Sequence, residues 1–128
     1  MAASWTLSDA WVFASLGGVG RRDGFSLQLV IAAADGINHA ILTEKEFVRG
    51  VHRLVAAELA GADPAADRYW RTDAGHSLYQ RTMRGRGLFA WMDVLLPALE
   101  ELGPPANGTL PLPPGAFERA VGAYLTKS

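Results

Sequence analysis

Basic side chains recur at helical spacing between residues 45 and 53. Lys45, Arg49, His52 and Arg53 stand three or four positions apart or side by side, so in a helix they project from neighbouring positions. Arginine can hold a guanine edge through two hydrogen bonds, and lysine and arginine both bind phosphates. The pattern predicts a cationic face that binds DNA or another partner. The alternative is a solvated face on which Glu46 pairs with Arg49.

The helix that must carry this face is predicted for residues 42–61. Thr43 and Glu46 have the spacing of a capping box, and Leu42 and Phe47 have that of a hydrophobic staple. Gly50 lowers helix propensity by about 1 kcal/mol relative to Ala, which close approach by another helix would explain. The apolar positions at three- and four-residue spacing form the opposite, inward face: Phe47, Val51, Leu54, Val55 and Leu59.

Further elements are predicted on both sides of this helix. Upstream, Thr6 and Asp9 form a second capping box for a helix that ends at Gly17, Phe25 suits a very short strand, and an apolar helix spans 27–37. Downstream, a strand near Leu59, a turn-rich connector and a returning strand over 68–72 form a hairpin, followed by a helix over 76–84.

The remaining chain is predicted to be a helical extension. A helix over 88–102 carries a near-heptad apolar stripe, and Pro97 should kink or divide it. We expect this stripe to form a homodimer seam; the alternatives are a core face or a ligand pocket against the first helix. A proline-rich loop over 103–115 and a helix over 116–125 follow. The seam residues are Leu88, Trp91, Met92, Leu95 and Leu99.

Composition excludes several classes of protein. The 128 residues are 49% hydrophobic and 20% charged, which is typical of one folded domain. Without cysteine, there is no disulfide or thiolate metal site, and we expect a cytoplasmic protein with no membrane partner. The net charge of −1 argues against strong nonspecific binding to nucleic acid.

The sequence offers little for catalysis or for a cofactor. The three histidines, His39, His52 and His76, lack the spacing of metal ligands on one helix. Ser77 beside His76 is a local coincidence, because a nucleophile needs a desolvated pocket. We therefore expect no enzyme activity, no catalytic residues, no metal and no cofactor.

Three stretches make the chain resemble the winged helix-turn-helix family. They are residues 8–10 with the apolar run that follows, residues 32–40 running into 43–47, and residues 69–75, which look like the end of a wing in MarR-like and PadR-like regulators. The chain is also similar to small actinobacterial winged-helix proteins. The resemblance covers about residues 6–84. It implies a mainly α chain with a small β-hairpin (α+β), that is, a winged helix-turn-helix domain over 1–86 with a C-terminal helical extension over 87–128.

The resemblance implies a homodimeric transcriptional regulator that binds double-stranded DNA. The helix after Thr43 would enter the major groove, and the hairpin would contact the backbone or minor groove. The implied DNA-binding residues are Thr43, Lys45, Arg49, His52, Arg53, Arg68 and Arg71. The turn of the hairpin departs from the family because it carries Asp63 and Asp67 where a wing usually carries cations. The same fold used as a protein-interaction module is therefore the alternative.

Overall fold

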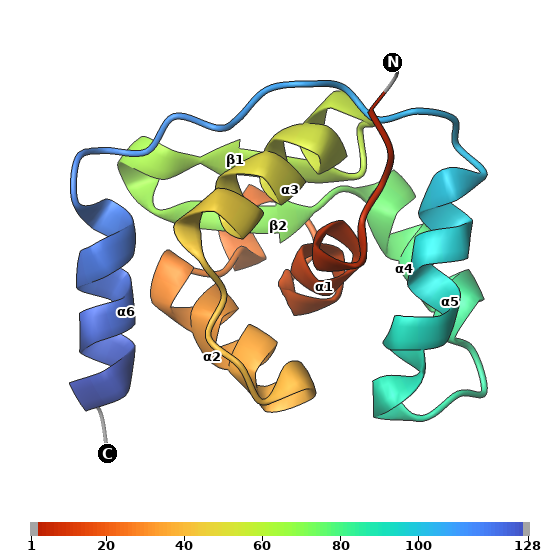
Figure 1. The fold of residues 1–128 in the computed structure, drawn as a ribbon, viewed down its shortest axis with the longest axis horizontal. Coiled ribbons are helices and arrows are strands. Elements are labelled where there is room, and N and C mark those ends of the chain that lie inside the picture. The colour runs from red at the N-terminus through yellow and green to blue at the C-terminus, as the bar shows by residue number, and fades with distance from the viewer. Residues whose placement is uncertain (1–2, 127–128) are drawn as a thin grey trace.

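The computed structural model describes residues 3–126, and this part of the chain is mainly helical with one small antiparallel sheet (Figure 1). The predicted mainly α, α+β composition with a hairpin is confirmed. Short 3-10 turns precede α2, join the two strands and precede α5. The elements in chain order are α1 (Leu7–Ser15), α2 (Leu27–Asn38), α3 (Glu44–Ala56), β1 (Ala60–Asp63), β2 (Arg68–Arg71), α4 (Asp73–Met83), α5 (Trp91–Glu100) and α6 (Ala116–Thr126).

Local hydrogen bonds fix where the first helices begin. Both predicted capping boxes are confirmed: Thr6 and Asp9 exchange bonds at the start of α1, and Thr43 and Glu46 do so at the start of α3. The helix predicted over 42–61 is shorter than expected and ends at Ala56. The chain leaves the helix because Glu58 has a left-handed φ of 64°, after which the backbone enters β1.

The hairpin is the two-stranded sheet predicted from the sequence. Gly61 pairs with Trp70 across it, and a Cβ atom at Gly61 would lie 2.3 Å from Cε2 of that indole, so glycine is required there. Phe25 forms an isolated antiparallel bridge with Tyr69, with N–H···O distances of 2.8 and 2.9 Å. The short strand predicted at Phe25 is thus a single bridge that holds the start of α2 on the hairpin.

The helix α1 lies at the centre of the molecule, between α2, α3 and α5 (Figure 1). It approaches α3 closely, because a Cβ atom added at Gly50 would stand 3.0 Å from Cγ2 of Val12. This contact confirms the reason expected for a glycine in the middle of α3. Val12 and Phe13 are fully buried, so α1 provides a buried apolar surface against which α3 packs.

The predicted dimer seam is wrong for three of its five residues. Trp91, Leu95 and Leu99 are at most 1% exposed within the single chain, because α5 packs against α1 and α4. For these three residues the alternative of a core face holds, and α5 is needed to complete the core. Only Leu88 and Met92 remain exposed, at 57% and 41%. Pro97 lies inside α5 without dividing it.

The C-terminal residues also join the same core. Phe117 of α6 is buried with its ring centroid 6.0 Å from that of Phe47, and the Tyr124 hydroxyl donates to Asp35 Oδ2 of α2 at 2.6 Å. Residues 87–126 and 3–86 therefore share one hydrophobic core; the outermost positions of the two predicted segments, 1–2 and 127–128, lie outside the described residues. No helix within residues 3–126 has the length and apolar character needed to cross a bilayer.

Truncation of Leu95 tests its place in the core. We expect Leu95→Ala to lower the free energy of unfolding by about 3 kcal/mol, because it removes a fully buried side chain and leaves a cavity. The control Met92→Ala, on the exposed side of the same helix, should change it by less than about 0.5 kcal/mol. Urea unfolding at two protein concentrations measures both. A dimer seam at Leu95 would instead make the midpoint depend on protein concentration.

Candidate nucleic-acid interface

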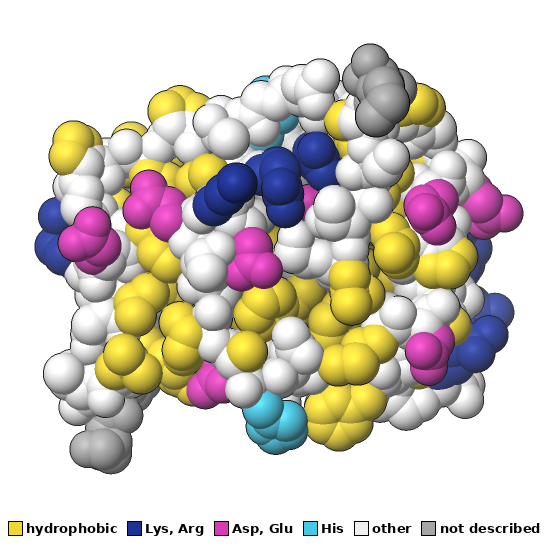
Figure 2. All heavy atoms as spheres, viewed as in Figure 1, with side chains coloured by type: hydrophobic (Ala, Val, Ile, Leu, Met, Phe, Trp, Pro, Cys, Tyr) yellow, Lys and Arg dark blue, Asp and Glu magenta, His cyan; other side chains and the backbone are white. Residues whose placement is uncertain are grey.

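The helix α3 follows α2 after the short connection over residues 39–43. His39 ends α2 in a left-handed conformation, with φ 52°, and its N–H bonds to Asp35 O at 2.7 Å. Basic side chains gather on the visible side of the molecule along α3, with acidic side chains beside them (Figure 2). This surface is the candidate interface, and its seven predicted residues have very different surroundings.

The start of α3 carries the most accessible of these residues. Lys45 is exposed and forms no ion pair with a described residue. Thr43 is also exposed, but its hydroxyl donates to Glu46 Oε1 at 2.9 Å and accepts from Glu46 N at 3.2 Å. Lys45 is thus free to contact an anion, whereas the hydroxyl of Thr43 is committed to capping the helix.

Arg53 is not on the outer face, and its predicted role as a DNA reader is corrected. Arg53 is only 8% exposed. Its Nη1 atom donates to Asp9 Oδ2 at 2.8 Å and to Ser4 O at 3.0 Å. Asp9 is fully buried in α1 and also accepts from Thr6 N at 2.9 Å. The guanidinium is drawn inward because it neutralises this carboxylate, which would be costly to bury alone.

Arg49 lies between these extremes. It is half-buried, its Nη2 donates to Ser8 Oγ at 3.2 Å, and its Nε is enclosed without a hydrogen-bond partner among the described residues. Its side chain therefore leans towards α1, on the same flank of α3 as Arg53. Only part of the guanidinium can reach a ligand on the outer face.

The other flank of α3 is covered by residues 103–115, which we call the strap. It crosses from the end of α5 to the start of α6 past α3 (Figure 1). Leu110 N donates to Val48 O of α3 at 2.9 Å, and His52 Nε2 lies 3.1 Å from Asn107 O. A Cβ atom at Gly108 would be only 2.6 Å from His52 Nε2, so the strap fits closely on this flank.

The strap was predicted as a loop, but its docking was not. The available signal was the pair Leu110 and Leu112 among the prolines: both are partly buried against the core. Prolines favour an extended chain, and two apolar side chains in such a chain can anchor it to a surface. His52, predicted as a base or phosphate contact, is therefore occupied by the strap in this conformation.

The two predicted contacts of the hairpin point in opposite directions. Arg68 is exposed, whereas Arg71 is 8% exposed and donates to Phe13 O at 3.2 and 3.0 Å. The Arg71 guanidinium carbon also lies 3.7 Å from the ring centroid of Tyr79. The role of Arg71 as a DNA contact is corrected, because residues an odd number apart on a strand face opposite sides. Burial lowers the pKa of Arg71 to about 10.

The acidic residues in the turn of the hairpin have structural partners. Asp63 pairs with Arg21 at 2.7 Å, and the hydrogen bond from Arg21 lowers the pKa of this carboxyl. Asp67 Oδ1 accepts from Leu27 N at 2.9 Å and so caps the start of α2. These two carboxylates hold the hairpin against the residues before α2.

The structure therefore brings together a smaller site than the sequence predicted. Lys45 and part of Arg49 share the exposed side of α3, and Arg68 is exposed on the hairpin. Among residues 3–126, no three His, Asp or Glu side chains are grouped so that they could hold a metal ion. Comparisons with protein-family models, with curated proteins and with solved structures find no match.

Removal of Arg53 tests its assignment as a structural residue. Arg53→Ala should lower the free energy of unfolding by about 3 to 5 kcal/mol, because Asp9 would be left buried and unpaired. The control Lys45→Ala removes one charge from the same helix and should change it by less than about 0.5 kcal/mol. Chemical unfolding followed by tryptophan fluorescence measures both. If Arg53→Ala and Lys45→Ala lowered the free energy of unfolding by equally small amounts, the structural role of Arg53 would be contradicted.

Proposed function

We propose that the chain is a winged helix-turn-helix protein that binds double-stranded DNA as a homodimer and regulates transcription. The observation that carries the proposal is the sequence of α2, a short turn, α3 and a hairpin joined to the start of α2 through Phe25 and Tyr69. In proteins with this arrangement, the second helix of the pair enters the major groove and the hairpin lies along the backbone. Such a function implies the cytoplasm, where a bacterial chromosome lies.

The accessible cations support a narrower contact than the sequence indicated. Lys45 and Arg49 stand one turn apart in the first half of α3, and the first turns of a reading helix are the part that meets the bases. Arg68 of the hairpin suits a phosphate. Arg53 and Arg71 instead hold α3 and the hairpin on α1, so they contribute by positioning these elements and do not touch the DNA.

The strap sets a condition on this function. The major groove is about 12 Å wide, which is little more than one α-helix needs. The docked strap lies beside α3 on the flank that carries Val48 and His52, so the two together are too wide for the groove. The strap must therefore leave this flank before α3 can enter the groove fully. Its few polar contacts with α3, Leu110 with Val48 and His52 with Asn107, suit a segment that can be released.

The proposed homodimer has a smaller apolar surface than predicted. Leu88, Phe89 and Met92 are exposed at 57%, 52% and 41%, and the ring of Phe89 stacks on His39 at 6.2 Å between centroids. These side chains lie at the junction of α2 and α5. A two-fold contact through this surface would give two copies of α3 and favour a symmetric DNA site.

Salt-dependent DNA binding tests the proposal. Duplexes selected from a random pool should bind the protein, and affinity should fall steeply with salt because counterions are released from the phosphates. The double variant Lys45→Ala/Arg49→Ala should weaken binding to the selected duplex at least about tenfold, because each substitution removes a contact with a base edge. Fluorescence anisotropy of labelled duplex measures both quantities.

The matched control removes the same charge elsewhere. Arg84→Ala/Arg86→Ala changes two exposed arginines that follow α4, and it should preserve most of the affinity. If both double variants lose affinity equally, binding does not depend on α3. If no duplex is retained even at low salt, the DNA-binding proposal fails.

The second candidate function is a protein-interaction module with the same fold. The docked strap, the withdrawal of Arg53 and Arg71, and the exposed apolar side chains Leu88 and Phe89 favour it. The salt titration separates the two candidates. An interface dominated by apolar contacts would keep its affinity as salt rises, whereas phosphate contacts would not.

A further inference from the structure

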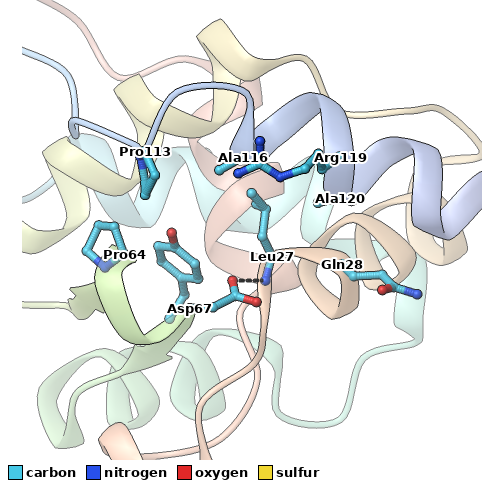
Figure 3. A pocket seen from close by; sticks show the side chains of 9 residues that line it. Leu27, Gln28, Pro64, Asp67, Pro113, Ala116, Arg119 and Ala120 are labelled. Carbon is cyan, nitrogen blue, oxygen red and sulfur yellow. Dashed lines mark hydrogen bonds between the residues drawn. The ribbon is translucent and has the colours of Figure 1, made fainter.

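A small cavity opens where α2, the hairpin turn and α6 meet. Its volume is ≈ 290 Å³, at the small end of the range for ligand sites. Residues from three separate parts of the chain form its walls (Figure 3). They are Leu27 and Gln28 of α2, Pro64, Asp67 and Tyr69 of the hairpin, and Pro113, Ala116, Arg119 and Ala120 of the strap and α6.

The Tyr69 hydroxyl is a hydrogen-bond donor that a ligand in this cavity could reach. Tyr69 lines the cavity, and the residue as a whole is 1% exposed. Its hydroxyl oxygen is not among the fully enclosed polar atoms, so water or a ligand in the cavity can accept its proton. Burial and the nearby Asp67 and Asp63 raise the pKa of Tyr69 to about 12, so the phenol stays protonated and able to donate.

The cavity also carries one charge of each sign. Asp67 and Arg119 lie on different walls, with Leu27 between them (Figure 3). Asp67 uses Oδ1 to accept from Leu27 N at 2.9 Å, and Arg119 uses Nη1 to donate to Pro114 O at 3.1 Å. The second oxygen of Asp67 and the other N–H groups of Arg119 have no hydrogen-bond partner among residues 3–126.

The apolar part of the wall separates these charges. Leu27 is buried, and Pro64, Pro113 and Ala120 complete the lining with small, rigid surfaces. A ligand with a single charge would satisfy one side chain and face a like charge on the other. A zwitterion with a short hydrocarbon chain would satisfy Arg119 through a carboxylate, Asp67 through an ammonium group and the apolar wall through its side chain.

We propose that this cavity binds a free α-amino acid with an apolar side chain, whose carboxylate accepts hydrogen bonds from Tyr69 and Arg119. Since Pro113, Ala116 and Arg119 belong to the strap and the start of α6, such a ligand would link the end of the strap to the hairpin. This inference is independent of DNA binding, because it concerns a different surface and is tested by direct binding to the full chain.

Leucine and two truncated analogues test the proposal by nuclear magnetic resonance. Leucine should shift the backbone amides of Leu27 and Ala116 in a saturable way. 4-Methylpentanoate, which lacks the ammonium group, and 3-methylbutylamine, which lacks the carboxylate, should each bind at least about tenfold more weakly, the loss that corresponds to about one unpaired charged hydrogen bond.

Two variants locate the site on the protein. Tyr69→Phe keeps the buried ring and removes only the hydroxyl, and it should weaken leucine binding about tenfold. Arg119→Gln removes the cation and should weaken it similarly. The control Tyr79→Phe deletes a hydroxyl that does not line this cavity and should bind leucine as the parent does.

Three results would overturn the proposal. Absence of a saturable shift with leucine rules out the ligand class, and so does equal binding of either analogue. Binding that survives Tyr69→Phe and Arg119→Gln unchanged rules out the cavity. None of these results bears on whether α3 binds DNA.

Discussion

The ion pair between Asp9 and Arg53 determines how α3 sits on the molecule. Asp9 has no exposed surface, and among the described residues only its Oδ2 is hydrogen-bonded, to Thr6 N at 2.9 Å and to Arg53 Nη1 at 2.8 Å. A buried carboxylate without its cation would destabilise the fold strongly. The pair therefore fixes the rotation of α3 about its own axis, and the packing of Val12 against Gly50 fixes its distance from α1.

This rotation decides which side chains of α3 remain available. Arg53 turns inward, Arg49 leans on Ser8, and Lys45 stays in solvent. On the opposite flank the strap covers Val48 and His52 through Leu110 and Asn107. The exposed surface of α3 is thus bounded on one side by the contact with α1 and on the other by the strap, which is held by the contacts of Leu110 and Asn107 with α3 and by the partly buried Leu110 and Leu112. Any partner of α3 meets a face whose width depends on the strap.

The parts of the fold that depend on local chemistry could be predicted from the sequence. The capping boxes at Thr6 and Thr43 and the hairpin all follow from residues close together in the sequence. The extended chain at Phe25 was also predicted, but its partner Tyr69 was not. The end of α3 could not be placed, because it depends on a left-handed Glu58, a conformation uncommon for that residue type.

The parts that depend on distant partners were missed. Arg53 has the pattern of an exposed cation until Asp9, 44 positions earlier, is brought beside it. The apolar stripe on α5 has the same residue spacing whether it packs against a second copy of the protein or against the core. Its burial against α1 and α4 depends on contacts between parts of the chain that are far apart in the sequence. The docking of the strap left only a weak signal, the apolar pair Leu110 and Leu112 among the prolines, and its main-chain contacts through Leu110 N and Asn107 O have no signature in the sequence.

Amide hydrogen exchange at Leu110 tests whether the strap is docked on α3 and so limits access to its outer face. This amide should be protected in the free protein, since it donates to Val48 O. Gly108→Val, whose side chain would collide with His52, should abolish this protection while amides in α1 stay protected. Exchange of the Leu110 amide in the parent protein at the rate of an unstructured peptide would show that the strap does not cover α3.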